Sequence, residues 1–99
     1  MKKQIVTTSL WDPSEHLETE EDTVMYLEAA LEENDPALIS AVLGDIARAK
    51  GMSQIAEKTG MGRTSLYKAL SPEGHPEFGT ILKVMDALGL QFKVTSIKA

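Results

Sequence analysis

The sequence predicts a mainly α fold of about five helices with a short β-strand near each end. Apolar residues recur at helical spacing in several segments, which is typical of amphipathic helices. Residues 53–70 have the pattern of two short helices joined at a glycine, a helix-turn-helix. Residues 4–10 are β-branched and residues 90–97 alternate apolar and polar side chains, as short strands do.

The first strand, residues 4–10, is expected to stop at Trp11-Asp-Pro13. An acidic helix follows over residues 20–33, because Thr19 and Asp22 have the spacing of a capping box. Its apolar stripe is expected to comprise Val24, Leu27 and Leu31.

The strongest amphipathic segment runs from Pro36 to Lys50, with Asp35 as its capping residue and Gly51 as its stop. Ser53 is expected to cap the next helix, which Gly60 ends.

Met61 is expected to fill the angle of the turn, and Gly62 to cap a second short helix from Arg63 to Leu70. A last helix begins at Pro76 and ends at Gly89, before the second strand. Its inward face is expected to comprise Phe78, Ile81, Leu82, Met85 and Leu88.

The second helix of the helix-turn-helix has one apolar and one polar side. At 100° per residue, Leu66, Ala69 and Leu70 share one side. Thr64 and Lys68 face the opposite way, with Ser65 and Tyr67 beside them. A solvated polar face is the simpler explanation, because most exposed helices have one.

Arg63 favours a DNA-reading face over a merely solvated one. It stands in the first turn, where the helix macrodipole disfavours a cation by a few tenths of a kcal/mol. An external phosphate or guanine edge would account for it, and helix-turn-helix proteins place their second helix in the major groove of DNA.

Composition suits one domain over residues 1–99, without cysteine and without a segment long enough to span a membrane. Residues 1–45 carry eleven acids against two lysines, a net charge of −9, and residues 46–99 carry eight cations against four acids, +4. This asymmetry indicates two different partner surfaces, although a purely solubilising acidic half is equally compatible. We expect a cytoplasmic protein, since residues 1–30 lack the pattern of a signal peptide.

An enzyme is the main competing class, and the sequence disfavours it. His16 and His75 are the only histidines and have no metal-ligand spacing, so no catalytic residue, cofactor or metal ligand is assigned. The acidic clusters lack apolar enclosure, which acid–base catalysis would need. A helical protein-interaction domain that does not bind DNA stays open as a further alternative.

The chain resembles a known family at several stretches. Residues 53–70 are similar to the helix-turn-helix of Cro/λ-repressor-like (XRE) proteins. Nearly the whole chain resembles the HigA-like probable addiction-module antidote proteins, most specifically in Leu66-Tyr-Lys-Ala-Leu-Ser-Pro-Glu-Gly74. One departure is Gly62, where many relatives have a capping serine.

The resemblance implies a λ-repressor-like bundle divided into an N-terminal strand and acidic helix (1–34), a DNA-binding core (35–89) and a C-terminal strand (90–99). It implies an antitoxin that binds operator DNA as a homodimer, represses its own operon and neutralises a small basic toxin of the RelE/ParE superfamily. A stand-alone XRE-type regulator remains the alternative. The residues expected to contact DNA are Gln54, Arg63, Thr64, Ser65, Tyr67 and Lys68.

Overall fold

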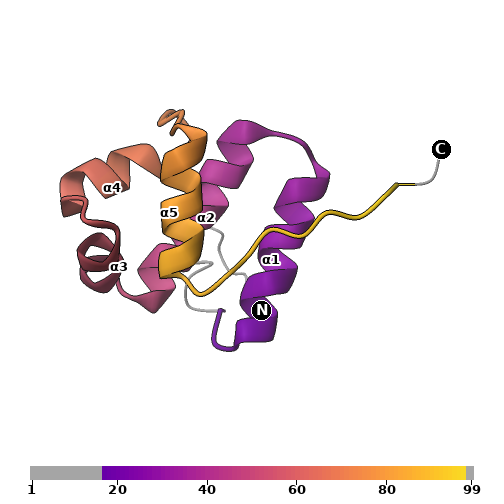
Figure 1. Ribbon diagram of the computed structural model, residues 1–99, viewed down its shortest axis with the longest axis horizontal. Helices are drawn as coiled ribbons and strands as arrows, with labels where there is room; N and C mark the ends of the chain where they lie inside the picture. The colour runs from indigo at the N-terminus through magenta and orange to yellow at the C-terminus, as the bar shows by residue number, and fades with distance from the viewer. Residues whose placement is uncertain (1–16, 98–99) are drawn as a thin grey trace, which may run out of the picture.

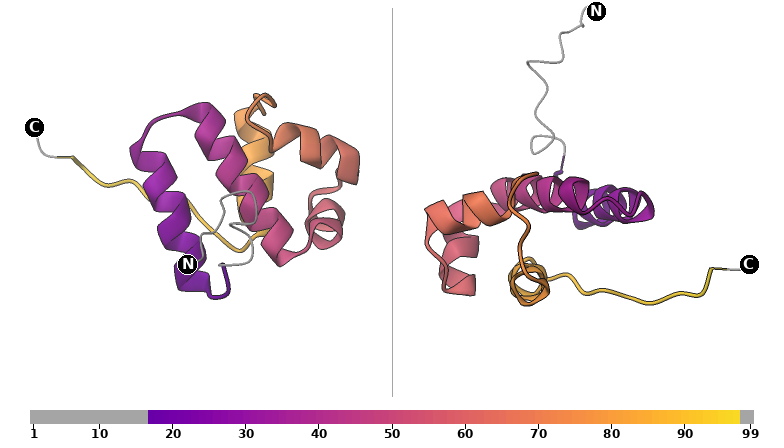
Figure 2. Two further views of the ribbon diagram at one scale, coloured as in Figure 1. Left: turned by 180° about the vertical axis from the view of Figure 1, so that it is seen from behind. Right: turned by 90° about the horizontal axis from the view of Figure 1, so that it is seen from above.

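The computed structural model describes residues 17–97, and these contain five helices and no strand (Figure 1). The helices are α1 (Glu20–Glu32), α2 (Pro36–Lys50), α3 (Met52–Thr59), α4 (Arg63–Ala69) and α5 (Phe78–Ala87). Seen from above, α1 and α2 lie in one layer, α5 lies in a second, and α3 and α4 close one end of the bundle (Figure 2). None of these helices is long and apolar enough to cross a bilayer.

The core is centred on α2, which packs against both α1 and α3, and α3 in turn packs against α4 and α5. Leu43 and Ile46 of α2 are fully buried, and so are Leu66 of α4 and Val84 of α5. Burying such side chains contributes about 1.5–3 kcal/mol each. Residues from three helices that are far apart in sequence therefore share one apolar centre.

The capping signals of the first two helices are confirmed. The Thr19 hydroxyl accepts a hydrogen bond from the Asp22 N–H, and the Asp22 carboxylate accepts one from the Thr19 N–H, at 3.0 and 3.2 Å. The Asp35 carboxylate accepts from the N–H groups of Ala37 and Leu38, with Pro36 in the first turn. These bonds satisfy donors that a helix start leaves without intrahelical partners.

Two predicted faces are partly wrong. On α1 the buried residues are Thr23, Leu27 and Ala30, whereas Val24 is exposed. The Thr23 hydroxyl can be buried because it donates to the Thr19 carbonyl oxygen. The sequence pattern favoured burial of Val24 because this residue is apolar and correctly spaced. The angle at which α1 packs against α2 instead buries the neighbouring row of side chains, which contains Thr23.

The last helix begins at Phe78, two residues later than predicted, with Glu77 as its capping residue. Val84, Met85 and Leu88 are its buried apolar residues, while Phe78 and Leu82 are exposed. Only a narrow row of α5 side chains contacts the core, so the remaining apolar side chains of this helix lie outside it.

The C-terminal strand is not found. Residues 91–97, hereafter the C-terminal arm, form no strand or helix and extend away from the bundle (Figure 1). A strand needs a partner for its backbone N–H and C=O groups, and the helical residues 17–90 offer no sheet edge to this arm. The predicted N-terminal strand and Trp11 lie outside the described residues, and the division into 1–34, 35–89 and 90–99 stays a prediction.

Candidate nucleic-acid interface

The turn between α3 and α4 fixes the angle between these two helices. Gly60 ends α3 with φ +75°, a left-handed conformation that glycine adopts without steric cost. The Met61 N–H then donates to the Ala56 carbonyl oxygen at 3.1 Å, and the Thr59 hydroxyl donates to the Ile55 carbonyl oxygen at 2.9 Å. Met61 packs against the core, as predicted.

One capping prediction in this unit is wrong. The helix α3 begins at Met52, and Gly51 occupies its capping position without a side-chain hydrogen bond. Ser53 therefore lies one residue inside the helix and is exposed. The reason is Met52, whose side chain is buried in the core. Its burial places Met52 in the first turn of α3, so the capping position falls at Gly51 and not at Ser53. Gly62 does cap α4, also without a side-chain bond.

The helix α4 is anchored to the core by its leucines. Leu66 is fully buried and Leu70 is 5% exposed, while Ala69 is half-buried. The Leu70 carbonyl oxygen lies directly against Gly44 of α2, where a Cβ atom would overlap it. The Ser71 hydroxyl donates to the Lys68 carbonyl oxygen at 2.8 Å, which satisfies part of the end of α4.

The opposite side of α4 is exposed. Its outward residues are the five that the sequence singled out on this helix: Arg63, Thr64, Ser65, Tyr67 and Lys68. No other described segment covers this side, so a surface of two cations, two hydroxyls and one phenol faces outward. Such groups can donate to phosphate oxygens and to the acceptor atoms of guanine.

Arg63 and Tyr67 form a pair on this surface. The Arg63 Nη2 atom donates to the Tyr67 hydroxyl at 3.4 Å, and the guanidinium carbon lies 5.8 Å from the centre of the tyrosine ring. The two residues are one helical turn apart, so their side chains meet on the same face. Tyr67 is 43% exposed, so its ring lies at the surface beside the cation and outside the core.

Gln54 lies apart from the α4 surface, in the first turn of α3. It lines a hollow of about 270 Å³ between the ends of α2, α3 and α5, together with Lys50, Lys58 and Asp86. The two lysines were missed as site candidates. Lys58 follows Gln54 by four residues on α3, a same-face spacing that the sequence did contain, whereas Lys50 ends α2 and reaches the hollow only through the packing of the two helices.

Charge is distributed unevenly over the helices. Residues 52–70 carry Lys58, Arg63 and Lys68 against Glu57, a net charge of +2. The helix α1 carries five acids and no cation. In Figure 1, α4 and α1 lie toward opposite sides of the molecule, so the basic and the acidic surfaces are separated in space.

A tyrosine network joins the acidic helix to α2. The Tyr26 hydroxyl donates to an Asp45 carboxylate oxygen at 2.7 Å, and Arg48 forms an ion pair with the other oxygen at 2.8 Å. Burial, followed by the hydrogen bond and the negative charge of Asp45, raises the pKa of Tyr26 to about 12. Among residues 17–97 no three His, Cys, Asp or Glu side chains converge as metal ligands would.

Comparison with known proteins identifies the family. Residues 7–96 match the model of a family described as probable addiction module antidote protein. This chain belongs to that family. Membership of this family suggests that the protein is an antitoxin and implies that it has a toxin partner.

A relative from Haemophilus influenzae, described as an uncharacterized protein, is 54% identical over 84 residues. The match covers 85% of this antidote-family chain and 87% of the relative. No solved structure is significantly similar.

Proposed function

We propose that this protein is a cytoplasmic, sequence-specific DNA-binding antitoxin of the HigA-like, Cro/λ-repressor-like kind. It represses its own operon and neutralises a small basic toxin of the RelE/ParE type. The observation that carries the DNA-binding part is the outward polar side of α4, held at a fixed angle by buried Leu66 and Leu70. Family membership carries the antitoxin part.

In this proposal α4 enters the major groove of the operator. Arg63 donates to the O6 and N7 atoms of a guanine, which is the commonest specific contact of arginine with DNA. Thr64, Ser65 and Lys68 contact neighbouring base edges or phosphates. Tyr67 holds the guanidinium of Arg63 beside its ring, which reduces the conformational freedom that Arg63 would lose on binding.

The hollow around Gln54 is the proposed phosphate contact of α3. The Gln54 side chain is a neutral donor, while Lys50 and Lys58 supply positive charge beside it. Phosphate contacts of this kind position a helix-turn-helix on the duplex without reading sequence. Asp86 lies in the same hollow, and its negative charge offsets part of the positive charge of the two lysines. The hollow therefore suits a contact with one DNA phosphate better than contacts with several successive phosphates.

A single module of this size contacts little DNA, so repression requires two half-sites about one helical turn apart. The protein therefore acts as a homodimer. The toxin is bound through the acidic side of the molecule, since the five acids of α1 attract a basic partner and speed its association. Separation of the two surfaces leaves the DNA face accessible while the toxin is held.

The decisive experiment measures the affinity of four proteins for the DNA upstream of the gene and for a random duplex. Arg63→Ala should weaken operator binding by about 5- to 150-fold, which corresponds to about 1–3 kcal/mol, and should weaken random-DNA binding much less. Lys68→Ala should weaken both duplexes alike and flatten the salt dependence.

Lys83→Ala is the matched control, because it removes one exposed cation from α5, a helix that carries none of the proposed DNA-contacting residues. It should leave the preference for operator over random DNA unchanged. An equal loss on both duplexes for Arg63→Ala would refute the role of Arg63 in reading sequence.

The two alternatives differ in their outcomes. A stand-alone regulator would bind the operator but would have no adjacent gene for a small basic protein that co-purifies with it. An interaction domain without DNA binding would capture such a partner yet show no salt-dependent gel shift with upstream DNA.

A further inference from the structure

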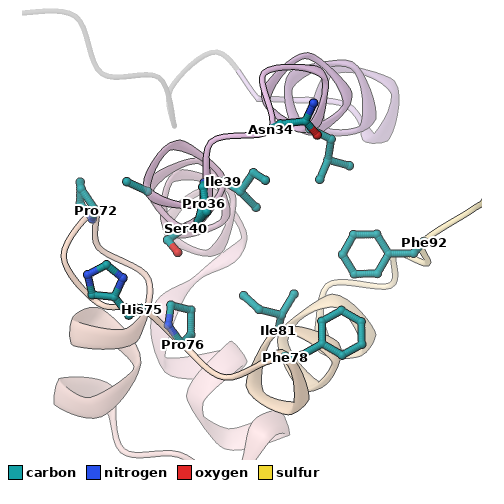
Figure 3. A pocket seen from close by; sticks show the side chains of 12 residues that line it. Asn34, Pro36, Ile39, Ser40, Pro72, His75, Pro76, Phe78, Ile81 and Phe92 are labelled. Carbon is teal, nitrogen blue, oxygen red and sulfur yellow. The ribbon is translucent and has the colours of Figure 1, made fainter. Parts of the chain in front are cut away.

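An apolar groove of about 490 Å³ lies on the side of the bundle away from the α3–α4 turn (Figure 3). One wall comes from the α1–α2 connection and α2, including Asn34, Ile39 and Ser40. The α4–α5 connection contributes Pro72, His75 and Pro76, and the remaining wall comes from α5 and the C-terminal arm, with Ile81 and Phe92. None of the twelve lining residues is Asp, Glu, Lys or Arg.

The root of the C-terminal arm already forms part of this groove. The rings of Phe78 and Phe92 are stacked, with centroids 6.3 Å apart and an interplanar angle of 23°. Beyond Phe92 the arm leaves the bundle, and Val94 and Ile97 are 98% and 88% exposed. Both side chains therefore present nearly all of their aliphatic surface to water, and burying that surface against a partner would be favourable.

We propose that the groove of one copy binds the C-terminal arm of a second copy, and that the exchange is reciprocal. Each copy carries one groove and one arm, so a two-fold axis satisfies both grooves and closes the assembly at a dimer. Val94 of the arm supplies an exposed apolar side chain that can pack against the apolar side chains lining the groove. The inference deepens the homodimer of the proposed function and rests on it.

The arm does not reach its own groove by folding back. Phe92 lies at the groove, so residues 93–97 would have to reverse direction at once. Between Leu90 and Ile97 there is no glycine, proline, asparagine or aspartate, and the one residue that favours tight turns, Ser96, lies too far along the arm to reverse it at Phe92. A second copy needs no reversal, because its arm enters from outside.

Charge distinguishes a second copy from a basic protein as the occupant. A basic partner would be attracted to carboxylates, and the groove lining contains none. The arm residues 93–97 carry one charged side chain, Lys93 at the start, and the segment Val94-Thr-Ser-Ile97 beyond it has none. The acidic residues that suit a basic partner lie on α1 instead.

The contact is small for a dimer. Each copy would contribute its twelve groove residues and the five arm residues 93–97, which make seventeen. Standard stable interfaces use about 20–30 residues a side, so this interface falls below that range. A weak dimer, formed at micromolar concentration and sensitive to single substitutions, is therefore expected.

The first test is sedimentation of the full chain and two arm variants. Val94→Asp should weaken dimerisation at least about tenfold, because it would place an unpaired carboxylate in an apolar groove. Thr95→Asp is the matched control: it adds the same charge to the next residue, which points to the opposite side of an extended chain. Wild type that stays monomeric at micromolar concentration, or equal dimerisation of the wild type and Val94→Asp, would overturn the proposal.

The second test uses the absence of native cysteine. Val94→Cys is mixed with a size-tagged Ala37→Cys variant, since Ala37 lines the groove, and oxidised mildly. A disulfide between the two chains is expected, and none is expected with Ala29→Cys, an exposed α1 position that does not line the groove. Val94→Cys chains that couple to each other but not to Ala37→Cys would show that the arms pair directly, against the proposal.

DNA binding by the same variants separates this inference from the proposed function. A dimer that crosslinks as expected but does not bind upstream DNA would contradict the repressor and leave the groove assignment intact. A Val94→Asp monomer that still prefers an isolated half-site over random DNA would support both.

Discussion

Substitution of Gly44 by alanine tests how α4 is held against the bundle. Gly44 lies in the middle of α2, and its missing side chain admits the Leu70 carbonyl oxygen and the Leu70 Cβ atom, the latter at 3.4 Å from an added Cβ. The clashing atom belongs to the backbone at the end of α4, so no side-chain rotation relieves it. Alanine can be accommodated only if α2 and α4 move apart.

Two opposing terms set the size of the effect. Alanine in a helix interior is favoured over glycine by about 1 kcal/mol. Overpacking against a rigid partner costs up to about 3 kcal/mol. The net expectation is destabilisation of about 2 kcal/mol, which for a domain of this size lowers the Tm by roughly 8–16 °C.

Thermal unfolding followed by circular dichroism measures this directly. Gly79→Ala is the matched control, because Gly79 is also helical but a Cβ there would meet no atom within 4 Å. Its Tm should stay the same or rise by a few degrees, by the helix-propensity gain alone. If Gly44→Ala were as stable as the wild type, α4 could not rest on α2 as described.

Three further predictions concern capping and titration. Thr19→Ala removes the capping box of α1 and should cost about 0.5–2 kcal/mol in urea unfolding. Ser53→Ala should change stability by less than about 0.5 kcal/mol, since Ser53 caps nothing, and a loss as large as that of Thr19→Ala would contradict the start of α3 at Met52. Because the pKa of Tyr26 is raised to about 12 in the folded state, the stability that its protonated form supplies is complete below pH 10 and is lost as the pH rises toward 12. The free energy of unfolding, measured by urea denaturation at several pH values, should therefore fall between pH 10 and 12 in the wild type and stay flatter in Tyr26→Phe. Parallel pH dependences for the two proteins would contradict a raised pKa of Tyr26.

Helix positions and most caps were predictable because their causes are local. The Thr19–Asp22 pair, Asp35 before Pro36, and the glycines at 51 and 60 each act on neighbouring backbone groups. The orientation of α4 was also predictable, since an eight-residue pattern with Leu66 and Leu70 on one side leaves few ways to bury it. DNA contact by its polar side is a prediction about a partner, and it stays one until binding is measured.

Helix faces were harder to predict because they depend on packing partners. On α5, Phe78 and Leu82 are as apolar as Val84 and Met85, yet only the second pair is buried. Periodicity indicates which residues can face a core, but the angle at which a helix crosses its neighbour decides which of them do. The network of Tyr26 with Asp45 was missed for the same reason, since the two residues are nineteen positions apart.

The failed prediction of a C-terminal strand is instructive because the sequence pattern behind it is real. Leu90, Phe92 and Val94 alternate with polar residues, and alternation is useful only to a segment with one buried side. Leu90 and Phe92 pack against their own core, whereas Val94 is 98% exposed. The described part of the chain thus accounts for two of the three apolar positions. The third has no partner within residues 17–97, and in the proposed dimer it packs in the groove of a second copy, which Val94→Asp with its Thr95→Asp control tests.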